Sequence, residues 1–225
     1  YDDQKSTIPR NSRRAIENVV FSHAKCRILS EERGREILNK CTVALTTDQY
    51  KEIISTMKKG FTGSRPNDPI ATALMLEANL GLRISDILRL RLSDIVKDGE
   101  RYRLAITEQK TGKARTFTVP LALYQFIRCY CLDHAIPPEH RIFPLTERTV
   151  QRHLQQVCDY LGYAGIGTHS FRKYYATEIY KNNGYNIALV QQLLQHSSTA
   201  VTQRYIGIQQ QEVEKAIENH LILDV

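Results

Sequence analysis

Two strand-like segments in an otherwise helical pattern limit most strongly what this chain can fold into. Residues 101–107 (RYRLAIT) and 114–120 (ARTFTVP) are rich in β-branched and aromatic residues, and the polar stretch EQKTGK separates them. Such a pair predicts an antiparallel hairpin whose turn lies at residues 108–113. The sequence therefore predicts a mainly α fold with a small antiparallel β-sheet, in the α+β class.

Apolar residues at helical spacing fill most of the chain on either side of this hairpin. TTDQYKEIISTM has a hydroxyl or Asp cap before an amphipathic run, and NDPIATALMLEANLGLR has Asp68 as N-cap, Pro69 at the first helical position and Gly81 at its end. Further helices are expected over LALYQFIRCYCLDHA, TERTVQRHLQQVCDYLG, SFRKYYATEIYKNN, IALVQQLLQH, TAVTQRY and QEVEKAIENHL.

The first forty or so residues differ from the rest in being polar and charged. One stretch, SRRAIENVVFSHAKCRIL, has apolar residues at helical spacing but is too short to bury a core of its own. We expect residues 1–42 to be the remainder of an upstream helical domain plus a linker, and residues 43–225 to form one domain with a C-terminal tail helix.

Composition narrows the class of protein. The chain has 225 residues, of which 42% are hydrophobic, so it can bury a sizeable core without disulfides. Its net charge of +7 favours a polyanionic partner, although solubility alone can account for such a charge. The number of cysteines is odd and none form a CxxC pair, which predicts a reduced cytoplasmic protein without a zinc site. The sequence also shows no membrane span and no signal-peptide pattern.

Four short segments carry the side chains that phosphodiester chemistry needs. Without a metal, that chemistry requires cations around the phosphoryl oxygens, an in-line nucleophile, and an acid for the leaving oxygen. The sequence has few acidic clusters that could hold Mg²⁺, so we expect cationic side chains to do this work with no metal or other cofactor.

The first two segments lie before and within the hairpin turn. In GLRISDILRLRLSDI, Arg83 follows a glycine at a break between two apolar helices, and Ser85 and Asp86 can cap the second helix. In EQKTGK, Lys110 and Lys113 lie at a turn from which an ammonium group can reach an oxyanion or donate a proton. Taken singly, the arginine reads as a surface residue and the lysines as ordinary turn composition.

The other two segments lie near the C-terminus. In THSFRKYYATEIY, Thr168 is the expected N-cap, and His169 and Arg172 share one helical face near a helix N-terminus, where a phosphate group is favoured. In LLQHSSTAVTQRYIGI, His196 precedes a hydroxyl-rich break and Tyr205 lies near the end of the next helix. Each of these residues alone could equally be a solvated polar residue, a cap or part of the core.

Together, these motifs resemble in order the catalytic domain of the tyrosine recombinases, the phage-type integrases and Xer-like enzymes, over about residues 43–225. The resemblance places the family's catalytic residues at Arg83, Lys110, His169, Arg172, His196 and Tyr205. Asp86 matches an acidic position that is structural in the family. Two positions depart from the pattern: Lys173 stands where the family usually has His, and Gln195 where it usually has Gly.

The resemblance implies a site-specific recombinase that forms a covalent 3′-phosphotyrosine intermediate without metal or ATP. Tyr205 would be the nucleophile, Arg83 and Arg172 would bind the non-bridging oxygens, and Lys110 would protonate the leaving 5′-oxygen. The two histidines would donate hydrogen bonds or accept the tyrosine proton. Two alternatives stay open, namely a type IB topoisomerase, which normally lacks the L-x-H-S-S pattern, and an inactive DNA-binding regulator with the same fold.

The resemblance also implies partners. Double-stranded DNA is the expected substrate, bound on the nucleoid by a homotetramer that holds two sites together. In the tail, Val213, Ile217 and Leu221 form an apolar stripe that could pack on its own domain or on a neighbouring subunit. The stretch SRRAIENVVFSHAKCRIL is similar to the last helix of the family's DNA-clamping domain, which would make residues 1–42 a remnant of that domain.

Overall fold

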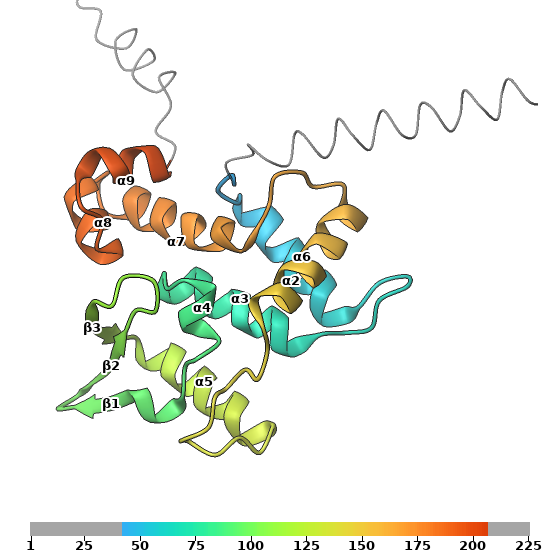
Figure 1. Cartoon of the computed structure of the whole chain (residues 1–225), viewed down its shortest axis with the longest axis horizontal. Helices are drawn as coiled ribbons and strands as arrows, with labels where there is room; N and C mark the ends of the chain where they lie inside the picture. The colour runs from blue at the N-terminus through green and yellow to red at the C-terminus, as the bar shows by residue number, and fades with distance from the viewer. Residues whose placement is uncertain (1–41, 207–225) are drawn as a thin grey trace, which may run out of the picture. The chain divides into compact units, whose positions relative to one another are not determined.

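The structure, a computed structural model, describes residues 42–206 (Figure 1). The helices are α2 (Thr47–Lys59), α3 (Asp68–Leu80), α4 (Ile84–Ile87), α5 (Leu121–Asp133), α6 (Glu147–Leu161), α7 (Thr168–Asn182), α8 (Ile187–Leu194) and α9 (Thr199–Ile206). A 3₁₀ turn, η1 (Leu92–Asp94), precedes the strands β1 (Ile95–Asp98), β2 (Arg101–Thr107) and β3 (Ala114–Val119). The expected mainly α fold with a small antiparallel sheet is confirmed.

The sheet has three strands in the order β1-β2-β3, with both pairs antiparallel. Leu104 is at its centre, fully buried, and is paired with Ile95 on one side and Phe117 on the other. The hairpin between β2 and β3 is the one that the sequence predicts. Strand β1 was not expected. The apolar helix predicted after Arg83 is only one turn long, and the chain then enters the sheet.

Local capping residues set where the helices begin. Thr46 and Gln49 form a capping box at the start of α2, in which each side chain accepts a hydrogen bond from the other residue's backbone. Helix α3 is capped by Asn67, whose side chain accepts a hydrogen bond from the Ile70 amide, so the predicted cap at Asp68 was wrong by one residue. Asp68 is instead the first residue of the helix.

Helix α3 forms the centre of the main core. It packs against α2 and α7, and most of its residues are buried around its whole circumference. It ends at Gly81, which has φ +59°, and a Cβ added there would lie 2.3 Å from Cδ1 of Tyr175 on α7. Only glycine allows this close approach, which brings the residues after α3 directly against α7.

Helices α8 and α9 pack against the later part of α7 (Figure 1). They share a small second cluster of buried residues, made by Ala176, Val190, Leu194 and Ile206. Helix α7 therefore belongs to the main core through Phe171 and to the second cluster through Ala176. The helix that carries Tyr205 depends on this smaller cluster for its position.

Two parts of the sequence analysis lie outside the described residues. They are the helical stretch within residues 1–41 and the tail stripe at Val213, Ile217 and Leu221. The division of the chain near residue 42 therefore stays a prediction. Within residues 42–206, no helix is both long enough and apolar enough to cross a membrane.

Candidate active site

Arg83 lies at the junction between α3 and α4. It follows the left-handed Gly81 by two residues, occupies the N-cap position of α4, and its side chain is 18% exposed. Its Nη1 atom donates to Oε2 of Glu108 at 2.6 Å. Because a guanidinium has five N–H donors, this ion pair leaves others for a ligand.

Asp86 does not cap α4, contrary to the sequence prediction, and no side chain does. It lies inside this short helix, is buried, and accepts a hydrogen bond from the Gln109 amide at 2.9 Å. Gln109 belongs to the β2–β3 turn next to Lys110. The carboxylate therefore fixes the turn against α4.

Glu108 is a buried carboxylate at the base of the same turn. Besides Arg83, its Oε2 accepts a hydrogen bond from Thr111 Oγ1 at 2.8 Å, and its Oε1 lies 3.4 Å from Nη1 of Arg115. Burial acts to raise the pKa of Glu108, but the hydrogen bonds from Arg83 and Thr111 outweigh it and lower the pKa. Glu108 is thus an ionised counter-charge among arginines.

Arg172 is almost completely buried, at 2% exposure, in the first half of α7. Its Nη1 donates to the Gly81 carbonyl at 2.6 Å and its Nη2 to the Leu194 carbonyl at 3.2 Å. It therefore joins the end of α3 to the end of α8. Helix α7 itself starts after Gly167 as N-cap, so the predicted Thr168 cap was wrong, and Thr168 is the first helical residue.

His169 and Lys110 are on the solvent-accessible side of this cluster. The pKa of His169 is lowered by partial burial first and then by the positive charges of Arg172, Lys110 and Arg83. These charges act on one imidazole because α7, the turn and the α3–α4 junction meet there. A neutral histidine is the form that can accept a proton.

His196 follows α8 and contacts α9. Its Nδ1 lies 3.1 Å from Oγ1 of Thr202, and that hydroxyl donates its own proton to the Ser198 carbonyl at 3.3 Å. The hydroxyl must then accept from Nδ1–H, which leaves Nε2 as the acceptor of a neutral ring. Burial, and after it the charges of Arg172 and Arg83, lowers the pKa of His196 and favours this form.

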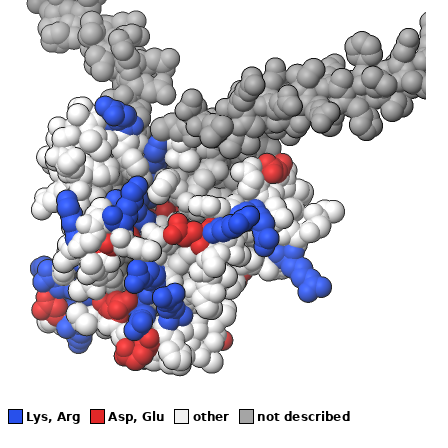
Figure 2. Space-filling model, viewed as in Figure 1, with Lys and Arg blue, Asp and Glu red and all other residues white. Residues whose placement is uncertain are grey.

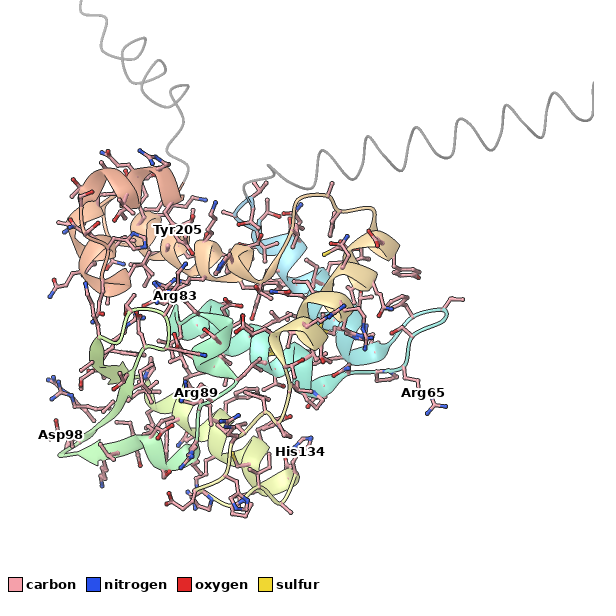
Figure 3. The ribbon with its side chains drawn as sticks, viewed as in Figure 1. Arg65, Arg83, Arg89, Asp98, His134 and Tyr205 are labelled. Atoms are coloured by element: carbon pink, nitrogen blue, oxygen red, sulfur yellow. The ribbon has the colours of Figure 1, made fainter. Side chains whose placement is uncertain are left out.

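Tyr205 lies edge-on to His196, with ring centroids 5.0 Å apart and an angle of 78° between the planes. Figure 3 shows Tyr205 and Arg83 close together between α7–α9 and the α3–α4 junction. Burial raises the pKa of Tyr205 to about 12, although Arg172 acts in the opposite direction. Its hydroxyl is buried and has no hydrogen-bond partner of good geometry within residues 42–206.

The two residues that depart from the family pattern both contact this cluster. The Nζ atom of Lys173 lies 5.5 Å from the centroid of the Tyr205 ring and also donates to the Thr42 carbonyl. Gln195 has a left-handed backbone, with φ +55°, which costs a residue with a side chain about 1–3 kcal/mol. Its Nε2 donates to the Ala114 carbonyl of β3 at 3.4 Å.

Sequence reasoning missed Glu108 and Arg115 as parts of the cluster. Arg115 is 4% exposed and has acceptors on three elements. One signal could have found it: Arg115 shares the alternation of β3 with Phe117 and Val119, which places a charged residue on the inward face of a strand. Charged residues are seldom fully buried unless they are paired.

The cluster is therefore a concentration of positive charge around a tyrosine. Of the predicted site residues, it brings Arg83, Arg172, His196 and Tyr205 together. The other two, His169 and Lys110, lie at its exposed edge, where the charge of Lys110 acts on His169. Figure 2 shows Lys and Arg side chains spread over much of the viewed face, with acidic groups interspersed among them. In residues 42–206, no group of three or more His, Cys, Asp or Glu residues is arranged to hold a metal ion.

Comparisons with known proteins give one consistent result. The model of the phage integrase family matches residues 44–212. The probable integrase/recombinase YoeC of Bacillus subtilis is 33% identical over 145 residues, which cover 61% of this chain and 77% of that protein. The tyrosine recombinase XerC of Bradyrhizobium diazoefficiens is 33% identical over 147 residues, which cover 61% of this chain and 45% of that protein.

Solved structures share the fold. The site-specific recombinase XerH, solved with its palindromic difH substrate after cleavage, superposes with a TM-score of 0.62 at 17% identity. The match covers 80% of this chain and 53% of XerH. The chain thus spans about half the length of XerC and of XerH.

Proposed function

The chain belongs to the phage integrase family of tyrosine recombinases, and we propose that it is a site-specific DNA recombinase acting through a covalent 3′-phosphotyrosine intermediate. The observation that carries this proposal is the position of Arg83, Arg172 and His196 around Tyr205, with Lys110 and His169 at the exposed edge of the same cluster. A phosphodiester brings a negative charge to a site with several cations. Their charges are arranged before the substrate arrives, which favours a transition state that gains negative charge.

The proposed reaction exchanges one phosphodiester for another. The Tyr205 oxygen attacks the phosphorus, the bond from phosphorus to the 5′-oxygen breaks, and the 5′-oxygen leaves with a proton from Lys110. Arg83 and Arg172 would hold the non-bridging oxygens through N–H donors that Glu108 and the carbonyls leave unused. Because the free hydroxyl can later attack the new bond, no energy source is consumed.

The tyrosine proton needs an acceptor, and the site offers neutral histidines. His196 has its Nδ1 committed to Thr202, so its Nε2 is the available acceptor beside the Tyr205 ring. Burial keeps the phenol protonated in the free protein, since its pKa is raised to about 12. We expect deprotonation only when phosphate and tyrosine are brought together.

The proposed substrate is double-stranded DNA in the cytoplasm, bound by four protomers on two sites. The net charge of +7 and the many basic side chains on the viewed face support DNA binding. XerH, which shares the fold, was solved with its DNA substrate. The tetramer, docking of the tail on a neighbouring subunit, and association with the nucleoid rest on family resemblance.

Covalent trapping tests the proposal. The full chain is incubated with genomic DNA fragments from its source, non-covalent complexes are dissociated in detergent, and the DNA that stays attached is sequenced. We expect adducts at defined sites for the wild type and for Tyr185→Phe, a control at an exposed tyrosine. Tyr205→Phe should bind the same DNA but form no adduct.

Each other outcome points elsewhere. Adducts formed by Tyr205→Phe would show that another residue is the nucleophile. Relaxation of a supercoiled plasmid that lacks the recovered site would favour a topoisomerase. Binding without any wild-type adduct would favour an inactive DNA-binding regulator.

A further inference from the structure

Arg115 occupies a position on β3 that none of the proposed catalytic steps uses. We propose that Arg115 and Glu108 form a positioning pair, which couples the Lys110 turn to the end of α8 and so to His196 and the Tyr205 helix. The inference rests on the proposed function, because Lys110 and Tyr205 are taken as acid and nucleophile. Neither Arg115 nor Glu108 is expected to contact the substrate.

Arg115 is bound to three separate elements. Its Nη2 donates to the Leu193 carbonyl at the end of α8, at 2.5 Å. Its Nη1 lies 3.4 Å from Glu108 Oε1 at the base of the turn and 3.5 Å from the Gly81 carbonyl at the end of α3. The guanidinium also makes a cation–π contact with the Phe117 ring, with its carbon 4.8 Å from the ring centroid.

Glu108 extends this connection to Arg83 and to the turn itself. One carboxylate oxygen binds Arg83 and Thr111, and the other faces Arg115. Thr111 directly follows Lys110, so the carboxylate holds the loop that carries the proposed acid. A displacement of Glu108 would therefore move Arg83 and the Lys110 turn together.

A second contact joins the same two elements. The Gln195 side chain donates to the Ala114 carbonyl, one residue before Arg115, from a backbone in the left-handed conformation. Gln195 is adjacent to His196. The hairpin and the end of α8 are thus linked twice, once through a β3 side chain and once through an α8 cap.

The fixed donors of a guanidinium, and not its charge, explain why an arginine is needed at residue 115. Burial first, and then the nearby charge of Arg172, lower the pKa of Arg115. A charged side chain is therefore costly at this position. An apolar side chain would avoid this cost, and buried ion pairs are often replaced by apolar residues without loss of stability. A planar group with several fixed donors, however, can orient three elements at once, which an apolar side chain cannot.

The test compares Arg115→Lys with a matched control, Arg103→Lys. Arg103 pairs with Asp98 at 3.0 Å at the exposed end of the same sheet, so the control makes the same chemical change away from the cluster. Lysine keeps the positive charge but cannot hold three acceptors. Both variants and the wild type are assayed in single-turnover cleavage of the site DNA recovered by covalent trapping.

We expect Arg115→Lys to bind this DNA within about twofold of the wild type and to cleave it about tenfold to a hundredfold more slowly, because small misplacements cost this much. A substrate with sulfur at the 5′-bridging position needs no acid, so it should restore part of the lost rate. Arg103→Lys should match the wild type on both substrates. An equal loss on both substrates, or no loss, would overturn the proposed coupling to Lys110.

Hydrogen exchange gives a readout that does not depend on activity. The amide of Gln109, in the turn, donates a hydrogen bond to the Asp86 carboxylate of α4. The His196 amide donates to the Gln191 carbonyl of α8 at 3.1 Å. Arg115→Lys should speed exchange in both peptides, and Glu108→Gln should do the same. Faster exchange in only one of the two peptides, or in neither, would refute the coupling. This result does not depend on cleavage. The absence of a wild-type adduct would instead count against the proposed function.

Discussion

Glu77 should make the stability of the domain fall as pH rises. Its side chain on α3 is fully buried, and neither carboxyl oxygen has a hydrogen-bond partner of good geometry within residues 42–206. Burial raises its pKa well above the usual value, and the nearby charge of Arg172 opposes this only in part. The folded state therefore holds a proton that the unfolded chain releases at a lower pH.

The sign and size of the effect follow from this shift. Between the unfolded pKa, near 4.5, and the higher folded pKa, the folded state binds more protons, so the free energy of unfolding decreases by about 1.4 kcal/mol per pH unit from this one group. Below that window the contribution is fully present. Glu77→Gln removes the titrating group and keeps its shape, so it should remove this part of the slope.

Urea unfolding of the wild type and of Glu77→Gln between about pH 4 and pH 8 measures this difference through the unfolding midpoint. Glu100→Gln, which removes an exposed carboxyl in the β1–β2 turn, is the matched control. Wild-type and Glu77→Gln curves that stay parallel across this range would refute the reasoning. An equal change of slope in the control would show that burial is not the cause.

Two further predictions concern the proposed reaction. Lys110→Ala should slow cleavage strongly, and a 5′-bridging sulfur should restore it, whereas equal slowing on both substrates would make Lys113 the candidate acid. Deleting residues from Glu212 onward, a segment outside the described residues, should leave cleavage of a suicide substrate intact while weakening assembly of synaptic complexes. Sedimentation on site DNA checks this, and equal tetramer formation by both proteins would mean that the tail packs on its own domain.

Local patterns predicted the elements better than their ends. The hairpin at residues 101–119 has strand composition on both sides of a turn, so its register follows from nearby residues. Helix starts were missed by one residue at Asp68 and Thr168, because neighbouring residues compete for the N-cap and packing decides between them. Strand β1 was missed because it is only four residues long and gains its partner from β2.

The proposed catalytic residues could be predicted from the sequence because their motifs are local and ordered along the chain. Arg115 and Glu108 were not found, because their role exists only where three distant elements meet. No spacing in the sequence shows that β3 approaches the end of α8. The inward position of Arg115 could have raised the question, but its acceptors are backbone carbonyls, which every residue has.

The anchoring of Arg172 has a consequence for how the sequence can change over time. Its two described acceptors are the main-chain carbonyls of Gly81 and Leu194, and not side chains. A substitution at residue 194 replaces an apolar contact but leaves the acceptor in place. Side chains around this arginine can therefore change without removing its acceptors, provided that the backbone stays in place. Gly81 is more restricted, because the backbone conformation and the Tyr175 ring both demand glycine there.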